Sequence, residues 1–436
     1  NHEINSYLAE AIAVQLNQRQ LQSSAHMLHE VLDERMFWVP SNRALDIAWL
    51  RSLPAQLHGQ WQNLAVGELS AELWTLWRAN VAGFVPALLL AVLVLWRRRQ
   101  LSNYVRNNSS NVGHYLHDRQ YYTPLAVLAV TMLSLPVAAL LASAGLVAQL
   151  HEQPLVYEFG TALLNMARLG LIFSIAYRLL APQGVLEVHL GWPQQHVSFL
   201  RKRVAWLALV IWLLALVVPL AQANLLSLSD DVLGLLLLAL GLLALSYLLG
   251  SALLHRYVKE PLSWWVRGLG LLLAMMPLLL AGALAAGYYY TVLQLTERLL
   301  ASLALLVSWL ILQCLLERGL IIAARRLAWQ RAEKARSSTD AATDPDKEFG
   351  GLNINEVNQQ SLRLVRLLLL LGFAVVLDWV WADVISLFAY LDNVILYEGS
   401  EPVTPGGPAS YLSLRDVLNA VVIAGMTIML ARNLPG

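Results

Sequence analysis

The sequence predicts an all-α, polytopic membrane protein with about nine transmembrane helices that follow a helical N-terminal segment. Of its 436 residues, 58% are hydrophobic and only 14% are charged. The mean hydropathy of +0.55 lies outside the range typical of soluble domains. Long apolar runs separated by short polar loops complete the pattern and indicate a membrane protein.

Residues 1–76 are polar enough to lie outside the membrane, and their leucines recur at helical spacing, so we expect a helical segment here. A turn is predicted at Pro40, Ser41 and Asn42, and Pro54 is expected to interrupt the helical pattern again. We interpret this segment as the C-terminal end of a larger periplasmic region.

The apolar runs that follow are long enough to cross a hydrocarbon core of ~30 Å. The predicted spans are 78–96, 124–148, 159–180, 204–222, 232–254, 266–287, 292–316, 364–388 and 412–431. We group them into residues 77–322 with seven helices, a cytoplasmic linker at 323–361 that is partly disordered, and residues 362–436 with the last two helices.

The distribution of arginine and lysine predicts the orientation, because loops that stay in the cytoplasm keep positive charge. Most of the 30 basic residues fall in alternate loops, and the other loops between spans carry only acidic charges. This places the N-terminal segment in the periplasm and Gly436 in the cytoplasm of a bacterial inner membrane. Such an export would require a signal peptide ahead of Asn1.

Basic and aromatic side chains near span ends are candidates for contact with lipid headgroups. The candidate lipid or interface anchors are Arg97, Arg98, Arg99, Arg201, Lys202, Arg203, Trp264, Trp265, Arg325 and Arg326. Tyr288, Tyr289 and Tyr290, with Trp96 and Trp206, are expected to form an aromatic belt at the interface. Residues 325–336 are expected to extend a helix; their charges either rest on anionic lipid or simply follow the positive-inside pattern.

Two ionisable side chains fall within predicted spans, where burying a charge in lipid is costly. Arg168, with Asn165, lies near the middle of the third span, and Asp378 lies in the eighth. They would mark a transport path if they paired between helices. The alternative is that each reaches toward the interface or supports a helix contact, since no second acid or histidine accompanies them.

Motifs that would indicate enzyme chemistry are missing from the sequence. It contains no phosphate-binding GxxxxGK[ST], no GxSxG nucleophile elbow and no HExxH metal motif. The single cysteine, Cys314, excludes an internal disulfide, and the net charge of +1 gives no basic face for nucleic acid. We therefore expect no catalytic residues, metal site, cofactor or nucleic-acid partner.

Several short segments resemble the large multi-span members of the mechanosensitive channel of small conductance (MscS) superfamily, the MscK-like and MscM-like channels. The segments are residues 34–42 (ERMFWVPSN), 187–193 (EVHLGWP), 355–363 (NEVNQQSLR), 390–393 (YLDN) and 431–436 (ARNLPG). The resemblance implies that a pore helix and a cytoplasmic β-domain follow Gly436, and that the subunits form a homo-oligomer, a heptamer. It also implies that the helices in this chain surround the pore rather than form it.

The resemblance predicts the sensor part of a mechanosensitive channel subunit, an osmotic safety valve whose partners are membrane lipids and inorganic ions. Two other functions are compatible with the sequence. A secondary transporter would need an internal repeat and a polar site at mid-membrane, and no convincing repeat is visible. A membrane scaffold would bind a periplasmic partner through residues 1–76.

Overall fold

The computed structural model describes residues 14–21, 23–24, 36–63, 66–111, 121–223, 231–259, 264–339, 354–387, 395–398 and 411–413, with six isolated positions between 416 and 427. The elements in these ranges are overwhelmingly helical. In chain order they are α2 (Ile47–Asn63), α3 (Val66–Ala79), the 3₁₀ helix η1 (Val81–Phe84), α4 (Val85–Asn111), α5 (Tyr122–Ala148), α6 (Pro154–Leu179), the π-helical turn η2 (Val185–His189), α7 (Gln194–Ala223), α8 (Val232–Lys259), α9 (Trp264–Ala285), α10 (Tyr289–Thr339), α11 (Ile354–Leu387), β1 (Ile395–Glu398) and β2 (Tyr411–Ser413).

Eight helices among the described residues, α4 to α11, are long and apolar enough to cross a membrane. They correspond to the first eight predicted spans, and this confirms the prediction of a polytopic helical membrane protein. The ninth predicted span, 412–431, lies largely outside the described residues and remains a prediction. Of the stretch expected to be disordered, residues 337–348, the first three are the last residues of α10, so the expectation is wrong for them, and the rest lies outside the described residues.

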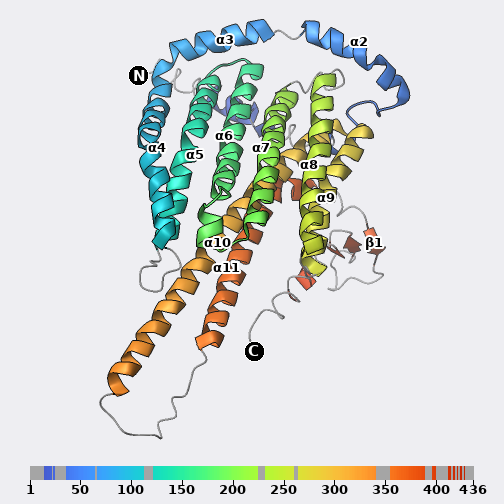
Figure 1. Ribbon diagram of the computed structural model, residues 1–436. Helices are drawn as coiled ribbons and strands as arrows, with labels where there is room; N and C mark the ends of the chain where they lie inside the picture. Colours follow the sequence, from blue (N-terminus) through green and yellow to red (C-terminus); the bar gives the residue numbers. More distant parts are fainter. Residues whose placement is uncertain are drawn as a thin grey trace, which may run out of the picture.

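The first six membrane helices stand in a row, each packed against its neighbour in the chain (Figure 1). Helix α10 crosses behind this row and contacts α6, α7 and α9, while α11 packs along α10. Because α10 is the helix that touches several members of the row, the largest core lies between it and α6 to α9. Fully buried leucines such as Leu214, Leu238 and Leu293 fill that core.

Helices α2 and α3 lie across one end of the row of membrane helices (Figure 1). We call residues 36–79 the strap, and the opposite end of the row, where α4 ends and α7 begins, the basic end. Pro54 lies inside α2, so the expected interruption is wrong. Proline has no backbone N–H, so the Leu50 carbonyl loses its helical hydrogen bond. Because Leu50 and Pro54 are both exposed, water can take the place of the missing donor.

Beyond α11, a short antiparallel pairing of β1 with β2 aligns Ile395 with Ser413. The hydrophobic pattern did not indicate these strands, since three or four residues are too few for a visible alternation. The predicted helical extension of the seventh span is confirmed, because α10 runs unbroken for 51 residues to Thr339.

Glycines set the spacing between α5 and α6. A Cβ atom added to Gly145 would lie 2.7 Å from the Gly160 carbonyl oxygen, and one added to Gly160 would lie 2.7 Å from the Gly145 carbonyl oxygen. The two backbones therefore approach as closely as small residues allow, as is common between membrane helices.

We expect Gly145→Ala to destabilise the fold by about 1–3 kcal/mol, because the new methyl group meets backbone that cannot move without separating the helices. Thermal unfolding of the purified protein in detergent measures the effect. Gly268→Ala is the matched control: its Cβ meets nothing within 4 Å, and alanine favours a helix over glycine. Equal unfolding temperatures for the two variants would contradict the prediction.

Candidate functional site

The predicted lipid anchors on α4 lie near the middle of that 27-residue helix. Arg97, Arg98 and Arg99 are exposed there. The guanidinium carbon of Arg97 lies 5.5 Å from the ring centroid of Trp96, which is itself 77% exposed. Such an exposed pair of cation and ring suits the boundary between hydrocarbon and headgroups.

The second basic cluster, at the start of α7, points in two directions. Arg201 stacks on Tyr177 of α6, with its guanidinium carbon 4.6 Å from the ring centroid. Arg203 instead lies 5.2 Å from the ring of Phe199 and 5.9 Å from that of Tyr247 on α8. Lys202 lies between them in the sequence and lines the same groove as Arg201.

The remaining anchors are placed by backbone alone. Trp264 and Trp265 are the first two residues of α9, and Arg325 and Arg326 belong to the long extension of α10. The side chains of these four residues lie outside the described part of the chain. Their role as anchors therefore remains a prediction.

The structure does not bring Arg168 and Asp378 together. The Arg168 Nη2 atom donates a hydrogen bond to Asn165 Oδ1, 3.0 Å away and one turn earlier in α6. Asp378 is exposed on α11, which packs on α10 rather than on α6. A membrane-buried ion pair between these two described residues is thus not formed.

The opposite end of the row carries a set of polar contacts that join the strap to the membrane helices. We call these contacts the clamp: residues 36–45 and Gln60 against the first residues of α8 and the corner between α9 and α10. Two backbone bonds form its base, from Asn42 N to Gly287 O (3.0 Å) and from Leu45 N to Ala285 O (2.8 Å). The backbone of the strap is therefore hydrogen-bonded directly to the backbone of the corner between α9 and α10.

Gly287 makes this close approach possible. Its φ of +99° is one that side chains rarely allow, and an added Cβ would lie 2.4 Å from the Asn42 carbonyl oxygen. Two further bonds hold the start of α10 to the strap. The Tyr290 amide donates to Ser41 Oγ (3.0 Å), and Thr291 Oγ1 donates to the Phe37 carbonyl oxygen (2.6 Å).

The carboxylate of Asp231 is the centre of the clamp. Its Oδ1 accepts from Gln60 Nε2 of the strap and from the Gly234 amide, each at 2.9 Å, so it also caps the N-terminus of α8. Its Oδ2 accepts from the Tyr289 hydroxyl of α10 at 2.8 Å. Gln60 Oε1 in turn accepts from the Leu233 amide at 2.8 Å. Three separate parts of the chain thus meet at one charge.

A second attachment lies further along the strap. In α3, Trp77 Nε1 donates to the Ala144 carbonyl oxygen of α5 at 3.3 Å, and Leu73 is buried beside it. Gln153 Nε2, ahead of α6, donates to Glu72 Oε1 at 3.1 Å. The strap is therefore attached to α5 and α6 on one side and to α8, α9 and α10 on the other.

Sequence reasoning missed the clamp. The prediction of an interfacial belt is wrong for Tyr289 and Tyr290, which are 0% and 4% exposed, because both pack inward from the start of α10. Trp206, by contrast, is 61% exposed, as an interfacial ring would be. The available signal was the turn around Ser41 together with Gly287 placed directly before the tyrosines.

The hydrogen bonds of the clamp fix the position of the strap relative to the membrane helices. Within the described ranges, no three His, Cys, Asp or Glu side chains come close enough to hold a metal ion.

The membrane helices match a known family model. The model described as "Mechanosensitive ion channel inner membrane domain 1" matches residues 81–397, which is most of the chain.

Whole proteins with similar sequences carry related names. The mechanosensitive channel MscK of Escherichia coli is 30% identical over 446 residues, which cover 100% of this chain and 39% of that protein. An uncharacterized MscS family protein of Haemophilus influenzae is 25% identical over 99% of this chain and 40% of its own length. The miniconductance mechanosensitive channel MscM of Escherichia coli is 25% identical over 99% of this chain and 41% of its own length. The chain thus spans about two fifths of these curated relatives.

We expect Tyr289→Phe to lower the stability of the protein by about 1.5–3 kcal/mol, because it removes a buried hydroxyl that donates to the charged Asp231. Thermal unfolding in detergent measures the loss. Tyr247→Phe is the control, since the Tyr247 side chain is 69% exposed and its ring, which faces Arg203, is kept. If both variants unfold at the temperature of the unmodified protein, the clamp is not a stabilising centre.

Proposed function

The chain belongs to the family of mechanosensitive ion channel inner membrane domains, and from that membership we propose that it is the lipid-facing sensor region of a channel subunit. In this proposal, membrane tension acts on the row of helices, and the row transmits it to a pore formed by a part of the protein that lies C-terminal to these residues. The whole protein would act as an osmotic safety valve.

One observation carries the proposal: the membrane helices form a thin array with large apolar surfaces left uncovered. In α4, Leu89 is 65% exposed, and in α11 none of the apolar stretch 364–382 is buried. A transporter would instead gather its polar groups around a site at mid-membrane. The ionisable residues Arg168 and Asp378 sit apart on separate helices.

Tension favours whichever state of the protein occupies the larger area in the membrane, in proportion to that difference in area. A row of helices in contact with lipid along its length is well suited to change its area. The clamp and the second strap attachment join distant helices of the row, so they favour the compact arrangement. We propose that expansion of the row weakens these contacts and that they help to set the opening tension.

The orientation of the chain is part of the proposal. The Arg201–Arg203 cluster lies in the first third of α7, which begins at the end of the row opposite the strap, and the exposed Arg97–Arg99 cluster lies at the middle of α4, which runs toward that same end. Because positive charge is retained in the cytoplasm, that end would face the cytoplasm of the bacterial inner membrane and the strap would face the periplasm. The subunits would assemble as a homo-oligomer, a heptamer in keeping with the family resemblance, and conduct inorganic ions.

We expect the full-length protein in proteoliposomes to pass current under suction, and Gly287→Ala to open at lower suction than the unmodified channel. The substitution forces Asn42 away from the corner and loosens the clamp. Patch-clamp recording measures both. Gly282→Ala, in the last turn of α9 before this corner, is the control, because its Cβ meets nothing within 4 Å. Absence of pressure-gated current would overturn the proposal, and equal thresholds for both alanine variants would overturn the role of the clamp.

The orientation predicts the result of labelling single cysteines in intact cells with a reagent that does not cross membranes. A cysteine at Gln62, exposed on the strap, should react, and one at Arg98, exposed on α4, should react only after the cells are permeabilised. The opposite result would reverse the orientation. Replacing Cys314 by serine gives the background for both.

A further inference from the structure

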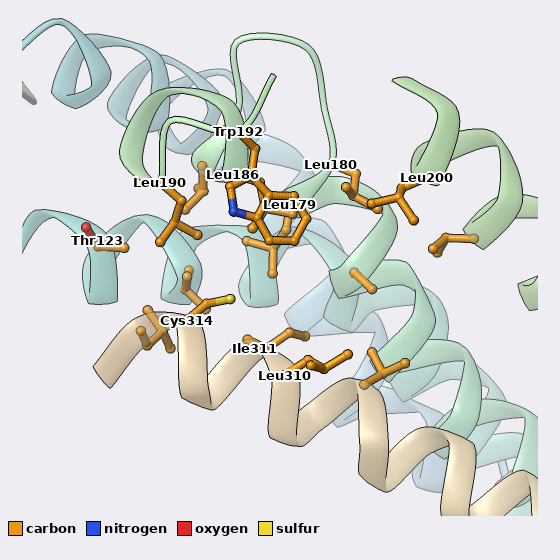
Figure 2. A pocket seen from close by; sticks show the side chains of 16 residues that line it. Thr123, Leu179, Leu180, Leu186, Leu190, Trp192, Leu200, Leu310, Ile311 and Cys314 are labelled. Atoms are coloured by element: carbon orange, nitrogen blue, oxygen red, sulfur yellow. The ribbon is translucent and has the colours of Figure 1, made fainter. Parts of the chain in front are cut away.

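An apolar pocket lies between α5, α6, η2, α7 and α10 at the basic end of the row (Figure 2). It encloses a cavity of about 170 Å³, close to the roughly 150 Å³ of an apolar cavity that stays dry and binds benzene. The ring of Trp192 lies on one side, with Leu310, Ile311 and Cys314 of α10 opposite it.

Specific contacts hold the pocket open. The loop that carries η2 is fixed over it by two bonds at His189: Arg318 Nη1 of α10 donates to the His189 carbonyl oxygen, and Thr123 Oγ1 of α5 is 3.1 Å from His189 Nδ1. The Trp192 amide donates to the Leu186 carbonyl oxygen at 3.2 Å, which closes the loop. The pocket wall is thus tied to two membrane helices.

The lining decides what can fill this space. The wall consists almost entirely of aliphatic carbon, and an apolar cavity does not retain water. Empty, it would forfeit dispersion contacts along its whole surface. Most of its lining residues belong to α5, α6, α7 and α10, which are long and apolar enough to cross a membrane, so we expect bilayer hydrocarbon beside the pocket. A lipid acyl chain therefore fits the pocket.

A basic groove adjoins the pocket. Leu180 lines both, and Arg201 and Lys202 line the groove directly after Leu200, which lines the pocket. The guanidinium carbon of Arg201 lies over the ring of Tyr177, and among the described residues its buried Nε finds no hydrogen-bond acceptor. A cation–π contact leaves the guanidinium N–H groups able to donate, and phosphate oxygens match these donors.

Glu187 also lines the groove, and its Oε2 accepts a bond from the Gln183 amide at 2.8 Å. Two cations against one carboxylate leave the groove positive. The charge of the groove is thus complementary to an anionic group. Because the groove lies beside the apolar pocket, we infer that this group belongs to a lipid rather than to a soluble ion.

We propose that the pocket and the groove together bind one anionic phospholipid of this leaflet, with an acyl chain between Trp192 and Cys314 and the phosphate at Arg201 and Lys202. The bound lipid would fill the space between α7 and α10 and would add its own contacts to those that already join these two helices. This binding does not depend on the channel proposal, since it requires only the fold.

Photocrosslinking tests the site directly. Full-length protein is placed in nanodiscs of phosphatidylethanolamine and phosphatidylglycerol in which a fraction of the phosphatidylglycerol carries a diazirine near the end of one acyl chain. Mass spectrometry should locate cross-links concentrated at residues 310–315 and 179–192. Cross-links spread evenly over exposed apolar residues such as Leu271 and Leu279 would overturn the proposal.

Two pairs of variants separate the acyl chain from the headgroup. Cys314→Trp fills the pocket and should abolish the concentrated cross-links, whereas Leu312→Trp, on the same helix but 46% exposed and outside the pocket, should keep them. The double variant R201Q/K202Q should weaken labelling by phosphatidylglycerol about fivefold for each charge removed. The control R106Q removes an exposed charge from the last part of α4 and should leave pocket labelling unchanged.

If Cys314→Trp fails to fold, the positions of the cross-links in the unmodified protein and the labelling of the charge variants still test the proposal. Unchanged labelling in a folded Cys314→Trp protein would exclude the pocket. Equal labelling by diazirine-bearing phosphatidylcholine and phosphatidylglycerol would exclude an anionic headgroup at Arg201 and Lys202. None of these outcomes is affected by whether the protein conducts ions.

Discussion

The arrangement of the strap depends on the hydrogen bonds that the Asp231 carboxylate accepts. The carboxylate accepts hydrogen bonds from Gln60, from the first turn of α8 and from Tyr289 at the start of α10. A charge that is partly removed from water must be compensated by such donors, and here they come from three segments that are far apart in the sequence. Displacing any one segment leaves the charge short of a partner, so the three positions are fixed together.

The thin row of helices is the other constraint. Each of α4 to α9 packs on its neighbours in the chain, and α10 packs against α6, α7 and α9. Such an array buries little of its outer members, as the exposed surfaces of α4 and α11 show. In water this would be unstable, but in a bilayer the lipid tails solvate these side chains. The shape of the row is consequently open to influence from the surrounding lipid.

The two ends of the row are held differently. At the strap end, short hydrogen bonds and the positive φ of Gly287 define one geometry. At the basic end, cations stack on aromatic rings and an apolar pocket lies open between α7 and α10. Directional bonds tolerate little displacement, whereas stacking and hydrocarbon contact tolerate more.

The sequence by itself determined the membrane spans, because a span needs only a local run of apolar residues, and eight of the predicted spans have a helix in the structure. It also indicated the family, through short segments such as residues 187–193. The tertiary structure alone decided that Tyr289 turns inward to Asp231, that Arg168 pairs with Asn165 rather than with Asp378, and that a pocket opens beside Cys314. The Tyr289–Asp231 bond, the separation of Arg168 from Asp378 and the pocket all depend on the packing of helices against one another, and hydropathy and charge patterns carry no information about which face of one helix meets which face of another.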